Sequence, residues 1–272
     1  MRALAVVLIA LSLVACGGHA KRKRMAEIKQ DLGAALIEKQ QYRQALVELR
    51  NSLELDPKSA RTYYHLGYVY LYGFKKPVDA ERALRAAIDV AEEPYSEAHN
   101  LLGLALNEQR RHDEALKQFE QALTNILYTT PQFAEQNLAQ TLILQGKVDE
   151  GVRRLKRLLR RVPNLCGAYI TLLDVGLKAG DSAMLAAYDP PFMKKCVHPQ
   201  QIASRISPDI LRRAYRRAVA RCERRQDEQC AFDLAQECVK RVPRTVGDTG
   251  PRCPTAKAPK PGVGFGGSKQ GD

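Results

Sequence analysis

A recurrence of about 34 residues constrains this chain more than any other feature of its sequence. A leucine followed by a small residue appears at Leu32-Gly33, Leu66-Gly67, Leu102-Gly103 and Leu138-Ala139, at spacings of 34, 36 and 36 residues. Two further sets keep this period: small Ala45, Ala80, Ala115 and Gly151, and large Leu49, Leu84, Phe119 and Leu155. Many units close with a proline: Pro57, Pro94, Pro131 and Pro163. Such a period is typical of a repeat protein.

The physical interpretation is a chain of helical hairpins. Small residues let the two helices of a hairpin approach closely, and large apolar residues fill the space beside them. Proline lacks an N–H group and ends the second helix of each unit. One hairpin cannot bury its apolar face alone, so neighbouring hairpins stack. The pattern resembles the tetratricopeptide repeat, which implies an all-α fold, a right-handed α-α superhelix.

The repeats predict the organisation of the chain. Four clear repeats are expected at about 26–59, 60–95, 96–131 and 132–163, and two degenerate ones at 164–200 and 207–243. In the fifth, a helix is expected at Gly167–Leu177, and Pro190-Pro191 is expected to end the next one. Residues 244–272 are rich in Gly and Pro and lack apolar periodicity, so a disordered tail is predicted.

The N-terminus has the features of an export signal. Arg2 precedes the apolar run 3–14, which is too short for a membrane span of about 20 residues. The run ends Leu13-Val14-Ala15-Cys16, which looks like a bacterial lipobox. Residues 1–15 would then be a lipoprotein signal peptide, Cys16 the acylated N-terminus and residues 16–25 a basic spacer. The alternative is an ordinary signal peptide cleaved near Ala20. Gly17, in place of aspartate, favours lipid anchoring at the periplasmic face of the outer membrane.

Six cysteines remain besides Cys16, all in the C-terminal part of the chain. Their even number in an exported protein indicates disulfides, and six cysteines allow 15 connectivities. The pairings that suit the hairpins are Cys166–Cys196, Cys222–Cys230 and Cys238–Cys253. The alternative is free thiols buried in helices. Metal-ligand spacings such as C-x-x-C are missing, so we expect no metal site.

No catalytic or cofactor-binding motif stands out in the sequence. P-loop, G-x-S-x-G, H-E-x-x-H and Rossmann glycine patterns are absent. The five histidines are scattered along the chain, and Gly262–Gly267 lacks the flanking strand and helix of a phosphate loop. We therefore expect a protein that binds another protein, with no cofactor and no enzymatic activity.

The first helices of the repeats are expected to line a concave binding groove. Tyr64, Tyr68 and Tyr72 are four residues apart, so they share one helical face, with the Tyr68 ring between the other two. Tyrosine is an enriched anchor residue in interfaces. Packing of this stripe against the next helix is the alternative. The predicted groove residues are Tyr64, Tyr68, Leu71, Tyr72, Asn100, Leu104, Asn107, Gln136, Gln140 and Ile143.

The formal net charge of +13 is concentrated on a few helices. A basic run spans residues 153–161, and Arg212, Arg213, Arg216, Arg217 and Arg221 are expected to form a similar convex face. The spacer has Lys21-Arg22-Lys23-Arg24, which is either solvated or in contact with anionic headgroups. An acidic partner or anionic surface suits an exported protein, and nucleic-acid binding is not expected.

One stretch carries a more specific resemblance. The third repeat runs from Ser96-Glu97-Ala98-His99-Asn100-Leu101-Leu102-Gly103 to Ala122-Leu123. It continues as Asn125-Ile126-Leu127-Tyr128-Thr129-Thr130-Pro131, with Asn137-Leu138 beyond. Together with the lipobox and the repeats, this resembles the type IV pilus biogenesis lipoproteins of the PilW/PilF/Tgl kind, over residues 13–163. The C-terminal cysteines and the Gly/Pro-rich tail depart from that pattern.

The resemblance implies a pilotin, a lipoprotein that helps secretin subunits reach the outer membrane and multimerise. The groove would then hold a secretin segment, other pilus-machine proteins would be partners, and the lipids on Cys16 would supply the membrane address. The competing hypothesis is a repeat scaffold lipoprotein of an exopolysaccharide secretion or cell-wall machine.

Overall fold

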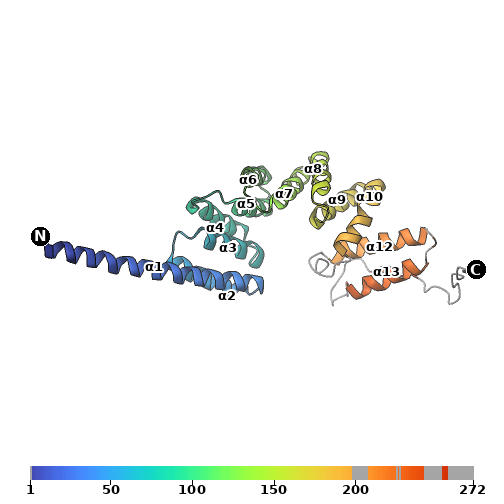
Figure 1. Cartoon of the computed structure of the whole chain (residues 1–272). Helices are drawn as coiled ribbons and strands as arrows, with labels where there is room; N and C mark the ends of the chain where they lie inside the picture. Colours follow the sequence, from blue (N-terminus) through green and yellow to red (C-terminus); the bar gives the residue numbers. More distant parts are fainter. Residues whose placement is uncertain (1, 198–207, 225, 227, 242–252, 257–272) are drawn as a thin grey trace, which may run out of the picture. The chain divides into compact units, whose positions relative to one another are not determined.

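The structure is a computed structural model that describes residues 2–197, 208–224, 226, 228–241 and 253–256. Every regular element within these residues is a helix, which confirms the all-α class. The chain divides into two compact units, residues 1–158 and 159–272, and each is described by itself. Figure 1 shows the helices in chain order.

The first unit contains the four clear repeats. Its third helix continues directly into a five-residue π-helix. The second helix of its fourth hairpin extends past residue 158, where the unit ends. The elements are α1 (Arg2–Glu38), α2 (Tyr42–Leu55), α3 (Ala60–Tyr68), η1 (Val69–Gly73), α4 (Pro77–Val90), α5 (Ser96–Glu108), α6 (His112–Thr124), α7 (Pro131–Leu144) and α8 (Val148–Arg161).

The recurring small and large residues meet as the period predicts. A Cβ atom on Gly67 would lie 2.5 Å from Leu84 Cγ, so only glycine lets α3 and α4 approach this closely. Gly33 has the same relation to Leu49, and Gly103 to Phe119. The large partners are fully buried. In the fourth repeat the glycine lies on the second helix instead, where a Cβ on Gly151 would lie 2.6 Å from the Ala139 carbonyl oxygen.

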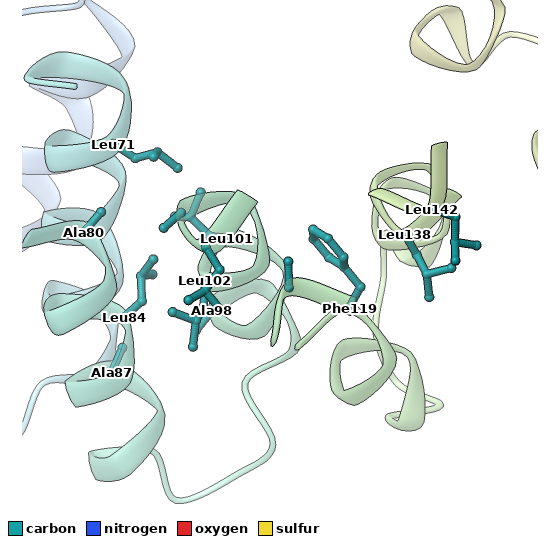
Figure 2. Close-up of a cluster of buried hydrophobic side chains, with 13 residues drawn as sticks. Leu71, Ala80, Leu84, Ala87, Ala98, Leu101, Leu102, Phe119, Leu138 and Leu142 are labelled. Atoms are coloured by element: carbon teal, nitrogen blue, oxygen red, sulfur yellow. The ribbon is translucent and has the colours of Figure 1, made fainter. Parts of the chain in front are cut away.

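The hairpins stack through apolar clusters, one between the first and second repeats and a larger one from the second repeat to the fourth. In Figure 2 the side chains of Leu84 and Ala87 on α4 point toward Leu102 on α5, and Phe119 lies between α5 and α7. Because α5 contacts its own partner α6 as well as α4, each hairpin covers the apolar face of its neighbour. This is the packing of a repeat solenoid, as expected.

The first two repeats also share a buried polar contact. Ser52 on α2 donates a hydrogen bond of 2.8 Å from Oγ to the Ala26 carbonyl oxygen, and its Oγ lies 3.1 Å from Thr62 Oγ1. Thr62 in turn contacts Ser59, which caps the N-terminus of α3. Ser52 and Thr62 are fully buried, so this chain of hydroxyl groups satisfies polar atoms that would otherwise be costly inside the core.

The second unit holds two further helical hairpins at the positions of the degenerate repeats. Its elements are α9 (Cys166–Ala179), α10 (Ser182–Phe192), η2 (Met193–Val197), α12 (Pro208–Arg224) and α13 (Glu228–Arg241). The predicted tail lies outside the described residues except for 253–256.

The prediction that Pro190-Pro191 ends a helix is wrong. Both prolines lie inside α10, which continues through Phe192 into the π-helix η2. A proline inside a helix removes a hydrogen bond and is costly in isolation. Here Phe192, Met193 and Cys196 are buried, so packing of this segment outweighs the cost.

The cysteines meet in the pairs that suit the hairpins. The Cα atoms of Cys166 and Cys196 are 5.6 Å apart, and the sulfur atoms lie at bonding distance. The second pair, Cys222 and Cys230, links α12 to α13, and the third joins Cys238 to Cys253. One disulfide therefore spans the α9–α10 hairpin, one closes the α12–α13 hairpin, and one attaches residue 253 to α13.

The N-terminal segment is part of a long helix. Helix α1 begins at Arg2 and runs without a break to Glu38, beside α2 (Figure 1). Its backbone does not distinguish the predicted signal peptide from the spacer. Within the part of the chain that the structure describes, no helix combines the length and apolarity needed to cross a bilayer.

Candidate functional site

The tyrosine stripe lies where α3 changes into a π-helix. In Val69–Gly73 the backbone hydrogen bonds span five residues instead of four, which shifts the side chains that follow on this segment. The rings of Tyr68 and Tyr72 lie 4.6 Å apart between centroids. Tyr64 packs against Tyr95, at 5.4 Å between centroids. The stripe thus takes part in two aromatic pairs.

These tyrosines line a pocket of about 340 Å³. The pocket lies between α3, α5 and α7, with the α6–α7 connection contributing two residues, so it spans three repeats. Its lining is Tyr64, Tyr68, Tyr72, Glu97, Asn100, Leu101, Leu104, Tyr128, Thr130, Phe133 and Asn137. A smaller pocket of about 200 Å³ adjoins it and shares Tyr72 and Leu104.

The pocket is an apolar environment with charge at its edges. Burial raises the pKa of both Tyr64 and Tyr72 to about 12, so both hydroxyl groups stay neutral and can donate hydrogen bonds at physiological pH. Burial also raises the pKa of Tyr128, and the Glu97 carboxylate adds to the shift. Lys75 lies 5.8 Å from the Tyr72 ring centroid, within cation–π range.

Two asparagines one repeat apart bridge the floor of the pocket. Asn137 on α7 donates a hydrogen bond of 2.9 Å from Nδ2 to Asn100 Oδ1 on α5. The other atom of each amide is Nδ2 of Asn100, a hydrogen-bond donor, and Oδ1 of Asn137, an acceptor. A peptide main chain offers the complementary pair of groups. The site can therefore accept apolar side chains beside tyrosine rings and main-chain groups beside the amides.

The structure brings half of the predicted groove residues together. Tyr64, Tyr68, Tyr72, Asn100 and Leu104 all line the larger pocket. Leu71 is only 5% exposed and belongs to the core, although it reaches the smaller pocket.

The other predicted groove residues lie elsewhere. Ile143 contacts Gly151, so it packs inside the fourth hairpin. Asn107 donates to Thr141 Oγ1 at 2.6 Å and lies 3.0 Å from His112 Nδ1, so both ends of its amide are engaged within the protein. Gln136 is half-buried and Gln140 is exposed, and neither lines these two pockets.

Several lining residues were not predicted. Tyr128 is 7% exposed because the α6–α7 connection turns it inward, and the turn is held by a 2.9 Å hydrogen bond from the Leu127 N–H to Asn125 Oδ1. The same turn leaves Ile126 and Leu127 95% and 80% exposed. Phe133 on α7 is also exposed at the pocket edge. The Asn-x-Leu-Tyr motif marked this connection, but the repeat pattern gives no position for a residue outside the helices.

The two predicted convex basic faces differ in how exposed their arginines are. On α8 the side chains of Arg153, Arg157 and Arg160 are exposed while Leu155 and Leu158 are buried, as the spacing predicts. On α12 the prediction is wrong for two residues. Arg212 is 1% exposed, and Arg217 makes two hydrogen bonds of 2.9 Å to the buried carboxylate of Asp189 on α10. These arginines belong to the interior of the second unit.

Comparison with known proteins supports the repeat assignment. Models of the TPR repeat and the tetratricopeptide repeat match residues 33–71 and 71–126. No curated protein matches the chain in sequence. In the described residues no cluster of His, Cys, Asp and Glu side chains suits a metal ion.

Several solved structures have a similar fold. PilF of Pseudomonas aeruginosa is 20% identical, with a TM-score of 0.63, over 83% of this chain and 96% of that one. PilW, described as a widely conserved type IV pilus biogenesis factor, is 22% identical, with a TM-score of 0.64, over 81% of this chain and 95% of that one. A thermophilic TPR protein from Thermus thermophilus is 17% identical, with a TM-score of 0.55, over 66% of this chain and 96% of that one. The chain shares their fold, a solenoid of tetratricopeptide repeats.

Proposed function

We propose that this protein is an outer-membrane lipoprotein that acts as a pilotin for type IV pilus biogenesis. In this proposal the aromatic pocket holds a short extended segment of a secretin subunit, and acylation of Cys16 holds the complex at the periplasmic face of the outer membrane. The protein works as a binding scaffold and not as an enzyme.

The pocket is the observation that carries the proposal. It is built from three successive repeats, so an extended peptide can lie across α3, α5 and α7 and contact each of them. Tyr68 and Tyr72 offer adjacent rings, and Asn100 and Asn137 offer amide groups one repeat apart. Aromatic anchors at the centre of a site carry most of the binding energy in protein interfaces.

The address in the proposal rests on the N-terminal sequence and on the likeness of fold. Leu13-Val14-Ala15-Cys16 resembles a lipobox, and the fold is shared over most of the chain with PilF and with PilW, a type IV pilus biogenesis factor. Two or more acyl chains anchor a protein stably, whereas one is marginal.

A double substitution tests the pocket. Tyr68→Ala combined with Asn100→Ala removes one anchor and one amide. Tyr68→Ala alone should cost about 1–3 kcal/mol of affinity, a tenfold to hundredfold loss. Secretin multimers in outer membranes should fall accordingly, while circular dichroism of the purified variant stays native. Leu144→Ala is the matched control, because Leu144 is 56% exposed on α7 and does not line the pocket.

Full secretin assembly in the double variant would place the binding surface elsewhere, most simply on the exposed arginines of α8. The membrane address is tested separately by Cys16→Ser. This variant should lose palmitate labelling and no longer sediment with the outer membrane. Retained labelling would show that Cys16 is not the acylated residue.

A further inference from the structure

Stacking of one repeat on the previous one uses a fixed set of positions on the first helix of each hairpin. In the second repeat these positions include Thr62, Leu66 and Val69, which are at most 5% exposed. In the third repeat the equivalent residues are Ala98, Leu102 and Ala105, and they are also buried, in one cluster with Leu84 and Ala87 of α4. The preceding hairpin covers these side chains in both cases.

The first repeat has the same apolar positions with no hairpin before them. Counted from Gly33, the residues equivalent to Thr62 and Leu66 are Ile28 and Leu32. They are 54% and 47% exposed, and Met25, one turn earlier on the same face, is 43% exposed. Repeat proteins need a polar outer face on their terminal repeats for solubility. This end of the solenoid is therefore an uncovered apolar stripe, which we call the α1 stripe: Met25, Ile28 and Leu32.

Positive charge lies directly beside the α1 stripe. Lys21, Arg22, Lys23 and Arg24 are all exposed, and no acidic residue occurs before Glu27. Lys21 is four residues before Met25, and Arg24 is four before Ile28, so both cations share the face of the stripe. Exposed apolar side chains flanked by lysine and arginine are typical of helices that lie in a membrane interface.

We propose that α1 from Lys21 to Leu32 lies flat on an anionic bilayer, with the α1 stripe inserted among the acyl chains and with Lys21 and Arg24 at the headgroups. The inference rests on the proposed lipid anchor. Cys16 is nine residues before Met25, which is about 14 Å along a helix at 1.5 Å per residue. Lipids on Cys16 would hold the stripe next to the bilayer.

A second copy of the chain fits this face less well than a bilayer does. Stable protein interfaces bury about 1,200–2,000 Å², and three side chains on one helix offer only a small part of that. Four consecutive cations also favour an anionic surface over an identical basic helix. The first helix would then act with the lipids to fix the orientation of the repeats on the membrane.

The experiment uses the mature chain, residues 16–272 with Cys16→Ser, so that no acyl chain contributes. Vesicles of phosphatidylcholine with 30 mol% phosphatidylglycerol are compared with vesicles of phosphatidylcholine alone, by co-sedimentation. The chain should bind the anionic vesicles at least tenfold more tightly, and binding should weaken as salt is raised. Ile28→Glu with Leu32→Glu should abolish this binding.

Two further variants keep the test interpretable. Lys21→Gln with Arg24→Gln should reduce binding at least threefold without touching any apolar residue. Val47→Glu with Val78→Glu is the matched control, because these side chains are 55% and 58% exposed outside the α1 stripe, and it should bind normally.

Equal binding to both vesicle types, or full binding by Ile28→Glu with Leu32→Glu, would overturn the proposal. So would a dimer in sedimentation velocity that the same two substitutions dissociate, since the stripe would then belong to a second copy. If Cys16 is not acylated in cells, the proposed lipid anchor is wrong, but the vesicle binding is unaffected because that assay uses an unacylated chain. The two failures are therefore distinguishable.

Discussion

The two units of this protein contain the same kind of helical hairpin but are held together in different ways. In the first unit, glycine against a large apolar side chain recurs in three successive hairpins, and apolar clusters join neighbouring hairpins. In the second unit, the sulfur atoms of three cysteine pairs lie at bonding distance, and Arg217 is tied to buried Asp189. Poor agreement with the repeat pattern thus coincides with covalent and ionic links.

The two units obtain their stability from different sources. Stacked repeats gain it from burial, which grows with every hairpin added. Two hairpins have fewer stacking neighbours than four, and crosslinks add stability by restricting the unfolded chain. Changes to packing should therefore affect the first unit, and changes to redox state the second.

The largest effect is expected from Gly67→Leu. Its Cβ alone would lie 2.5 Å from Leu84 Cγ, so α3 and α4 must separate. We expect the first unit to lose about 3 kcal/mol or more of unfolding free energy, at or above the usual range for overpacking. Chemical denaturation followed by circular dichroism measures this.

The control for Gly67→Leu is Lys117→Leu, which adds a leucine to an exposed site on α6. It should change stability by less than about 0.5 kcal/mol. If Gly67→Leu were as stable as this control, the glycine-to-leucine contact would not hold the hairpin together.

The next effect concerns the crosslinks. Cys166→Ser with Cys196→Ser opens the loop that this disulfide closes and should cost about 2–4 kcal/mol in the second unit. Limited proteolysis should show cleavage within residues 159–197 and leave the first four repeats intact. If both units resisted proteolysis as well in the variant as in the parent, the disulfide would not stabilise the second unit. Alkylation of all six cysteines in the denatured, unreduced parent would show that no disulfide forms.

A smaller effect is expected from pH in the first unit. His65 is half-buried, its Nε2 atom has no hydrogen-bond partner, and burial lowers its pKa to about 4, with Arg61 adding to the shift. The unfolded state, with a pKa near 6.5, binds a proton that the folded state does not. The contribution of neutral His65 to the free energy of unfolding is therefore fully present above about pH 6.5. As the pH falls toward 4, roughly 2 kcal/mol of it is lost.

Replacement of His65 with glutamine removes this titration. Denaturation midpoints at pH 7 and pH 4.5 should then differ less for His65→Gln than for the parent. An unchanged difference would assign the acid sensitivity to another group. Cys166→Ser with Cys196→Ser should leave this pH dependence intact, because His65 belongs to the other unit.

The sequence predicts the repeats well because their contacts lie close together in the chain. Gly67 and Leu84 belong to one hairpin, so their spacing already specifies their contact. Cys222 and Cys230 flank a turn, so proximity again follows from local structure. The Tyr64, Tyr68 and Tyr72 stripe follows from helical periodicity.

The features that the sequence did not predict depend on distant contacts. The π-helix at Val69–Gly73 follows Tyr68, and Tyr64 packs against Tyr95 in the connection between α4 and α5. Tyr128 lines the pocket because of a turn between helices. The sequence predicts that Arg212 is exposed and that Pro190-Pro191 ends a helix. Packing within the second unit overrides both predictions.

The short separation between packing partners also bears on how such a chain can change over evolutionary time. Gly33 and Leu49, Gly67 and Leu84, and Gly103 and Phe119 each lie within a single repeat of 34 to 36 residues. Duplication of one repeat in the gene copies both partners at once, and deletion removes both, so neither event leaves a bulky side chain without its glycine. The number of repeats can therefore vary between lineages without new mutations to restore the fit inside each hairpin.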